Sequence, residues 1–414
     1  MATTYRAPGV FVEEVQGGTR PIMAVGTSTT GFVGVAPKAD APRGEAIEIT
    51  NWSNFVQYFV ADDADDVPPD VVSTHLSHAV NGFFLNGGRR CYVVAIGGED
   101  GISDALDVMA KIDDIAIVAA PGYIGTAAYE ALRAHCETLG DRVAIVDPPE
   151  GVEHLRSLVT VGIEDAAPRR GRAAAGEGET SDSGEVPGVR PPDSSFLALY
   201  FPWLRIADPL APRGGARNLV NVPPSGHLAG IWSRTDATRG VHKAPANEPV
   251  RGALGLVRLI GRAEQEELNS RGVNCIRYFT REGILVWGAR TLAAESSEYR
   301  YLSVRRLVNM IKESIANDTR WVVFEPNDYT LWKSIERDCS AFLTLLWRDG
   351  ALIGQKPEDA FFVKCDEETN PPPVRDAGRV VTEIGIAPVR PAEFVIFRIG
   401  QKTASTPTSN RGGS

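Results

Sequence analysis

The sequence predicts a protein of mixed α/β and α+β class, with two domains placed between two extended arms. Three observations lead to this prediction. The 414 residues exceed what one small core accommodates. Short apolar runs with strand composition alternate with amphipathic helical stretches, as in domains with a buried sheet. Strand-like stretches also lie near both ends of the chain, where no neighbouring sequence offers a pairing partner.

The first domain is expected over residues 26–239. Residues 26–37 alternate small, β-branched and aromatic side chains and predict its first strand. A short helix capped by Thr50, Asn51 or Ser53 follows, and a second helix is expected over residues 71–85. Further strands are predicted from the segments RRCYVVAI, IAIVAAPG, RVAIVDPP and FLALYFPWL.

Residues 165–195 differ in composition from the rest of this domain. They are rich in Gly, Ala, Ser, Pro and charged residues, and they contain few apolar side chains. Such a segment buries too little apolar surface to order itself. We therefore expect a flexible, exposed loop within the first domain.

The second domain is expected over residues 240–392, with an α/β core. Residues 274–288 predict a hairpin, and Ser303 to Asn317 predict a helix. The segment WVVFE has strand composition, and Asn327 or Asp328 is placed to cap a helix that runs to about Asp349. The apolar stripe of that helix consists of Leu331, Ile335, Cys339, Phe342 and Leu346. Two later strands are predicted from the segments AFFVKCD and RVVTEIGIAP.

The two ends of the chain read as arms, over residues 1–25 and 393–414. Pro8 and Gly9 break helical structure and can act as a hinge. Beyond the last strand, the final residues have the composition of a disordered tail. The arm strands either join sheets of neighbouring copies or fold back onto their own second domain. Their apolar residues are Val10, Phe11, Val12, Val15, Phe394, Val395, Ile396, Phe397 and Ile399.

Composition excludes several classes of function. No apolar run approaches the roughly 18 residues that span a bilayer, and the start MATTYRAPGV lacks the features of a signal peptide. We therefore expect synthesis in a cytosol and no direct membrane insertion.

The five cysteines are scattered and form no CxxC pair, which predicts reduced thiols. Residues 1–240 hold 19 Lys and Arg against 31 Asp and Glu, which argues against a nucleic-acid partner and favours solubility.

The sequence contains only weak candidates for catalytic or metal-binding residues. His75 and His78 share one helix at a spacing that can hold a metal, but no third ligand lies nearby in the sequence. Asp113, Asp114 and Asp147 flank apolar strands, where carboxylates serve as catalytic groups in open α/β sheets. Neither a GxSxG motif nor a phosphate-binding loop ending in GK[ST] is present. The sequence therefore predicts no enzyme, no metal and no cofactor.

Segments in two regions of the chain resemble those of a known protein family. The opening segments are YRAPGVFVEEV, TRPI and VGTSTTGFVGVAP. The later segments are YRYLSVRRLVNMIKESI, WVVFEPND, FLTLLWRDGAL, AFFVKCDEETNPP and IGIAPVRPAEFVIFRI. Over residues 1–40 and 240–400 the chain resembles the contractile tail sheath proteins of myophages and phage tail-like injection systems.

The resemblance implies a building block, with a C-terminal core domain and strand-donating arms. Family members form stacked sixfold rings around an inner tube protein, in a metastable extended state, and contract to drive the tube through a target envelope. The implied partners are the chain itself, the tube, baseplate proteins and terminator or cap proteins. Assembly is expected in the bacterial cytoplasm, within a phage tail or a tail-like particle.

The tube-facing surface is the least defined part of this expectation. Arg305, Arg306 and Lys312 are candidate tube contacts on the helix Ser303 to Asn317, and a solvated or intersubunit helix face is the alternative. Two other functions stay open from the residues alone: a different self-assembling shell protein, and an α/β enzyme with Asp113, Asp147 or His75 in its site.

Overall fold

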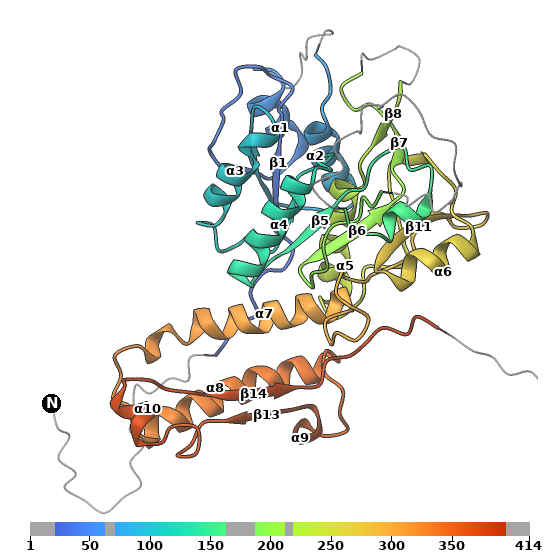
Figure 1. Ribbon diagram of the computed structural model, residues 1–414. Helices are drawn as coiled ribbons and strands as arrows, with labels where there is room; N and C mark the ends of the chain where they lie inside the picture. Colours follow the sequence, from blue (N-terminus) through green and yellow to red (C-terminus); the bar gives the residue numbers. More distant parts are fainter. Residues whose placement is uncertain (1–20, 63–70, 163–186, 212–217, 395–414) are drawn as a thin grey trace, which may run out of the picture.

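The computed structural model contains two units, a large α/β unit and a smaller C-terminal unit, which meet along a long helix, α7 (Figure 1). The predicted α/β class with mixed sheets is confirmed. The large unit runs to about residue 301, and the C-terminal unit begins with α7 (Leu302–Asp318). The structure describes residues 21–62, 71–162, 187–211 and 218–394.

A nine-stranded sheet forms the centre of the large unit, in the order β2-β3-β1-β4-β5-β6-β11-β12-β9. The six strands from β3 to β11 run parallel, and β2, β12 and β9 join antiparallel at the two edges. The bounds are β1 (Thr30–Gly34), β2 (Ile47–Ile49), β3 (Cys91–Ala95), β4 (Ile117–Ala119), β5 (Val143–Val146), β6 (Leu197–Phe201), β9 (Glu248–Pro249), β11 (Val273–Phe279) and β12 (Gly283–Val286).

A second, antiparallel sheet of the large unit has the order β10-β7-β8. Its strands are β7 (Leu204–Ala207), β8 (Leu219–Val222) and β10 (Ala253–Leu256). The helices of the large unit are α1 (Trp52–Phe59), α2 (His75–Leu85), α3 (Ile102–Met109), α4 (Thr126–Leu139), α5 (Ser225–Arg239) and α6 (Arg262–Ser270), with short 3-10 turns η1 (Glu99–Gly101) and η2 (Leu155–Leu158).

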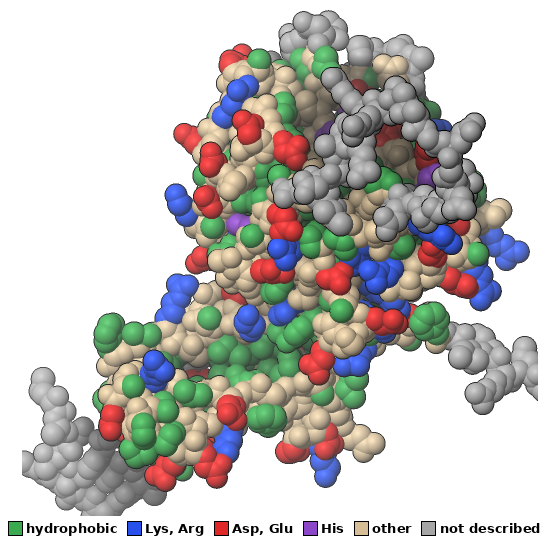
Figure 2. Space-filling view, viewed as in Figure 1, with side chains coloured by type: hydrophobic (Ala, Val, Ile, Leu, Met, Phe, Trp, Pro, Cys, Tyr) green, Lys and Arg blue, Asp and Glu red, His purple; other side chains and the backbone are tan. Residues whose placement is uncertain are grey.

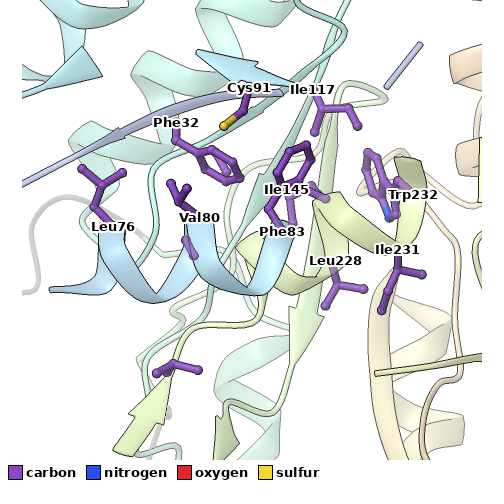
Figure 3. Packing of buried hydrophobic residues seen from close by; sticks show 14 of the residues in the cluster. Phe32, Leu76, Val80, Phe83, Cys91, Ile117, Ile145, Leu228, Ile231 and Trp232 are labelled. Atoms are coloured by element: carbon purple, nitrogen blue, oxygen red, sulfur yellow. The ribbon is translucent and has the colours of Figure 1, made fainter. Parts of the chain in front are cut away.

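Alternation along the strands divides the large core into two layers. Phe32 and Val33 are neighbours on β1, yet they belong to clusters on opposite faces of the sheet, because successive side chains of a strand point to opposite sides. Helices α1, α2 and α5 cover one face, and α3 and α4 cover the other. Figure 3 shows Phe32, Val80, Phe83 and Trp232 converging between β1, α2 and α5. Both faces are therefore buried, as in doubly wound sheets.

Helices α2 and α5 pack unusually close to each other. A Cβ atom on Gly226 would lie 2.2 Å from the Cα of Ala79, and one on Gly82 would lie 2.3 Å from the ring of His227. Glycine at these positions lets the two helix backbones approach, and it leaves His227 enclosed between them.

The C-terminal unit consists of long helices over a small sheet. The antiparallel strands β13 and β14 form a two-stranded sheet, and a separate hydrophobic cluster joins α7, α8 and these strands. The remaining elements are η3 (Arg320–Val322), α8 (Tyr329–Arg348), α9 (Pro357–Ala360), β13 (Phe361–Lys364), α10 (Pro372–Asp376) and β14 (Glu383–Ile386).

The predicted long helix of this unit is confirmed as α8. Asp328 is its N-cap, and its side chain accepts a hydrogen bond from the Leu331 amide at 2.9 Å. Every residue of the predicted stripe is buried in the C-terminal cluster, because the spacings of three and four place them on one helical face. The predicted hairpin over 274–288 is likewise confirmed as β11 and β12.

Two predictions for this half of the chain are wrong. WVVFE is not a strand: η3 and a turn occupy this segment, and Phe324 has a left-handed backbone with φ of 73°. The boundary at residue 240 does not separate two sheets either. Strands β9, β11 and β12 follow that residue and join the nine-stranded sheet, since β11 pairs in parallel with β6.

The predicted loop over 165–195 is also corrected for its described part. Residues 163–186 lie outside the described residues, whereas residues 187–195 are held against the large unit. The Arg190 side chain is buried and donates hydrogen bonds to the carbonyls of Arg271 and Leu292, at 3.1 and 3.2 Å. A single arginine with several carbonyl partners fixes a segment whose composition predicts flexibility.

Candidate assembly surfaces

Within the described residues, the two-stranded sheet of the C-terminal unit has a free edge on each side. Strands β13 and β14 pair over four residues, from Phe361 opposite Ile386 to Lys364 opposite Glu383. Among the described residues no third strand joins this sheet. Each strand thus has one outer edge whose backbone groups are available to an added strand.

Apolar side chains are exposed on the same unit. Phe362 on β13 is 57% exposed, and its ring lies over Gly385 of β14, where a Cβ atom would come within 2.1 Å of the ring. Phe324 is fully exposed beside Val323. Figure 2 shows hydrophobic side chains gathered on this unit, in the lower part of the view. Patches of this kind mark surfaces that meet other proteins.

The first described residues run along α7 in the opposite direction. The Met23 amide donates to the Asp318 carboxylate at 2.6 Å, and the Val25 amide donates to the Ser314 hydroxyl at 3.0 Å. Ile22 is buried in the C-terminal cluster. The N-terminal segment therefore enters beside the C-terminal end of α7.

The last described residues leave the same unit at its other end. The Ile353 amide donates to the Ala387 carbonyl at 2.8 Å, and the Val389 amide donates to the Ala351 carbonyl at 3.1 Å. The chain then rises toward the large unit as far as Phe394, which is 75% exposed. Figure 1 shows the two described ends at opposite sides of the C-terminal unit.

Most of the predicted arm residues lie outside the described residues. These are Pro8, Gly9, Val10, Phe11, Val12, Val15, Val395, Ile396, Phe397 and Ile399. Phe394 is described, and its side chain is exposed. Strand donation by the arms stays a prediction.

The prediction that Arg305 and Arg306 face a tube is wrong, because both side chains are buried within the subunit. Arg306 forms a bidentate ion pair with Asp236 of α5, donates to the Thr27 carbonyl at 3.0 Å and lies over the Trp232 ring. Arg305 stacks on the rings of Phe196 and Tyr299. These arginines join α7 to the large unit.

Lys312 is exposed, and it lines a groove of about 260 Å³ between α7 and the large unit. Its Nζ lies 3.5 Å from the Gly140 carbonyl across that groove. Glu313 also lines the groove, and burial, reinforced by the Asp141 carboxylate, raises its pKa to about 7. Of the three predicted tube contacts, Lys312 alone offers a surface charge.

The two helix histidines do not form a metal site. His78 is buried, with its Nε2 atom 3.5 Å from the Asp208 carboxylate, and burial lowers its pKa. His75 meets the edge of Trp203 instead. In the ranges that the structure covers, no group of three or more His, Cys, Asp or Glu side chains is placed to hold a metal ion.

The three carboxylates at the strand ends have structural contacts. Asp113 and Asp114 are exposed and pair with Arg320 and Arg90, at 3.7 and 2.9 Å. Asp147 is fully buried at the end of β5, and it accepts hydrogen bonds from the Ser225 amide and hydroxyl, at 2.9 and 2.6 Å.

Asp147 therefore ties β5 to the first residue of α5. A carboxylate is favoured at this position because the N-terminus of a helix carries partial positive charge. Burial nevertheless raises the Asp147 pKa to about 6.

The five cysteines are all buried, and none is paired in a disulfide. None of the described helices is both long and apolar enough to cross a bilayer.

The sequence alone does not point to the residues that receive the N-terminal segment or that neutralise Arg306. Asp318 and Ser314 receive the N-terminal segment, and Asp236 neutralises Arg306. Their partners lie between 70 and 295 residues away in the chain, so no local pattern signals them.

Family comparisons agree with this arrangement. Residues 173–292 match the family model described as the phage tail sheath protein central domain, and residues 294–402 match the phage tail sheath C-terminal domain. The chain belongs to the contractile tail sheath protein family. Membership places it among structural proteins of phage tails and tail-like particles.

Individual relatives support the same assignment. The tail sheath protein of Vibrio phage KVP40 is 28% identical over 177 residues, which is 42% of this chain and 26% of that relative's length. The chain thus matches only about a quarter of that curated relative.

Solved sheath structures are matched over nearly their whole length. The sheath of an extracellular contractile injection system, PVC, in its contracted state has 28% identity and a TM-score of 0.75, covering 97% of this chain and 99% of that one. A chain of the anti-feeding prophage (AFP) baseplate structure has 28% identity and a TM-score of 0.73, covering 96% and 100%.

Proposed function

We propose that the chain is the sheath subunit of a contractile phage tail or tail-like injection particle. It polymerises as stacked hexameric rings around an inner tube, in a metastable extended state. Contraction then drives the tube through a target cell envelope. The observation that carries this proposal is the likeness to a contracted injection-system sheath over 97% of the chain.

Strand donation is the contact that holds neighbouring copies together in this proposal. The described chain ends leave from opposite ends of the C-terminal unit, and among the described residues that unit has two strand edges without a partner. A strand from each of two neighbours would extend the β13–β14 sheet on both sides. Backbone hydrogen bonds of this kind give strong attachment without a large rigid interface, so the subunits can rotate while they stay linked.

The remaining partners follow from this role. An inner tube, baseplate proteins and terminator or cap proteins complete the particle, which is assembled in the bacterial cytoplasm. Because Arg305 and Arg306 are buried, Lys312 is the remaining candidate for a tube contact. A Lys312→Glu chain is expected to form sheath polymers but to bind tube more weakly, whereas undiminished tube binding would remove Lys312 from the contact.

Electron microscopy of the purified full-length chain, beside a version without residues 1–20, tests the proposal. We expect hollow, regularly striated tubes from the full chain and only monomers from the truncated chain. Thermal unfolding of both proteins controls for folding. Striated tubes from the truncated chain would reject strand donation by the N-terminal arm.

A further inference from the structure

The last described residues form a strap, residues 387–393, that connects the two units. At its start the strap is held by backbone hydrogen bonds to Ala351 and Ile353 of the C-terminal unit. Pro388 and Pro391 fix φ within it and restrict its conformations. At its far end, Glu393 reaches the large unit.

Glu393 pairs with Arg290, which follows strand β12. The Arg290 Nε donates to the Glu393 carboxylate at 2.9 Å, and a second guanidinium nitrogen donates to the other carboxylate oxygen. The Arg290 side chain is 6% exposed and the Glu393 side chain 18%. Paired geometry of this kind fixes direction as well as distance.

Arg290 is held in place by the large unit. The fully buried Asn274 of β11 accepts from the Arg290 amide at 2.7 Å and donates to the Arg290 carbonyl at 2.8 Å. The guanidinium also donates to the Asn269 carbonyl at 2.8 Å. The arginine is therefore oriented by the large unit's own residues, and the strap is the part that docks.

We propose that the Arg290–Glu393 pair is a latch that sets the direction in which the chain continues beyond Phe394. The latch ties the root of the C-terminal arm to the large unit, although the rest of the strap belongs to the C-terminal unit. Losing Glu393 leaves a buried arginine without its counter-charge and frees the strap beyond Val389. The consequence for assembly rests on the proposed function, because a misdirected arm misses the neighbouring sheet.

Distance measurements between spin labels test the latch in the full-length chain. One label is placed at Ala263→Cys, which is exposed on α6, and the other at Phe394→Cys. The five native cysteines are buried and are expected to resist labelling. We expect a narrow distance distribution with Glu393 intact. In Glu393→Gln and Glu393→Ala it should broaden by about 12 Å, the span of a freed chain of five residues.

Glu266→Gln is the matched control, because it removes a carboxylate from an exposed ion pair with Arg262 on the surface of the same unit. It should leave the distribution narrow. An unchanged distribution in both Glu393 variants, with unchanged thermal unfolding, would overturn the latch.

Microscopy of the unlabelled Glu393→Gln chain separates the latch from the proposed function. Few or short tubes, beside normal tubes from the parent chain, are the expected result. Normal tubes from the variant would overturn the role of the latch in assembly. If the parent chain itself forms no tubes, the proposed self-assembly fails, while the label distances still decide the latch.

Discussion

The large unit and the C-terminal unit differ in how the strands of their sheets are paired and covered. In the large unit, six parallel strands are paired on both sides, and helices cover both faces of the sheet. In the C-terminal unit, two strands pair over four residues, and no other strand of the described residues pairs with their outer edges. An isolated two-stranded sheet is marginally stable in water. The large sheet is thus completed by its own strands, whereas among the described residues the small sheet packs on α7 and α8 and has no further strand at either edge.

Truncating the centre of the large core has the largest expected effect. Trp232 is fully buried, and its indole donates to the Tyr200 hydroxyl at 3.2 Å and supports Arg306. Trp232→Ala should lower the free energy of unfolding by about 3–5 kcal/mol, through lost burial and a cavity. Urea unfolding measures this. Tyr278→Ala, at an exposed site, is the control and should change it by less than about 0.5 kcal/mol.

Acid should act on the large unit through the buried side chain of His227. Burial, helped by nearby His78, lowers the pKa of His227 to about 4, so the folded state keeps it neutral. An unfolded histidine, with a pKa of about 6.5, gains a proton first as the pH falls. The contribution of His227 to the free energy of unfolding should therefore fall by about 2–3 kcal/mol between pH 6.5 and 4. Residues 302–394 contain no histidine and lack this response.

Urea titrations at pH 7 and pH 4.5 check this prediction. His227→Gln should remove the His227 contribution of about 2–3 kcal/mol from the acid dependence. Asp147 acts with the opposite sign, because its raised pKa makes protonation below about pH 6 favour the folded state. An equally steep pH dependence in His227→Gln would contradict the assignment.

The smallest expected effect lies in the C-terminal unit. Asp328 caps α8, and Asp328→Ala should cost about 1 kcal/mol through the lost hydrogen bond to the Leu331 amide. Asp328→Asn keeps a side-chain acceptor and should recover most of that loss. Thermal unfolding of the parent chain and the two variants would report it, and equal stability of all three chains would reject the cap.

The sequence predicts helices and their caps more accurately than it predicts which distant residues they contact. Asp328 and the stripe of α8 are read correctly, because caps and helical spacing are local signals. WVVFE has strand composition, but in the described residues no strand lies beside it, and composition alone does not supply one. Arg306 looks like a surface cation until Asp236, 70 residues away, is placed against it. Sheet order and ion pairs depend on contacts between distant residues, which local patterns do not encode.

Backbone hydrogen exchange on the monomer and on the assembled polymer tests whether neighbouring strands complete the β13–β14 sheet. We expect amides at the outer edges of β13 and β14 to exchange rapidly in the monomer and to become strongly protected in the polymer. The amides of β1, β4 and β5 should be protected in both states, because their partners lie within the subunit. Equal exchange of the β13 and β14 edges in monomer and polymer would contradict completion of this sheet by neighbouring strands.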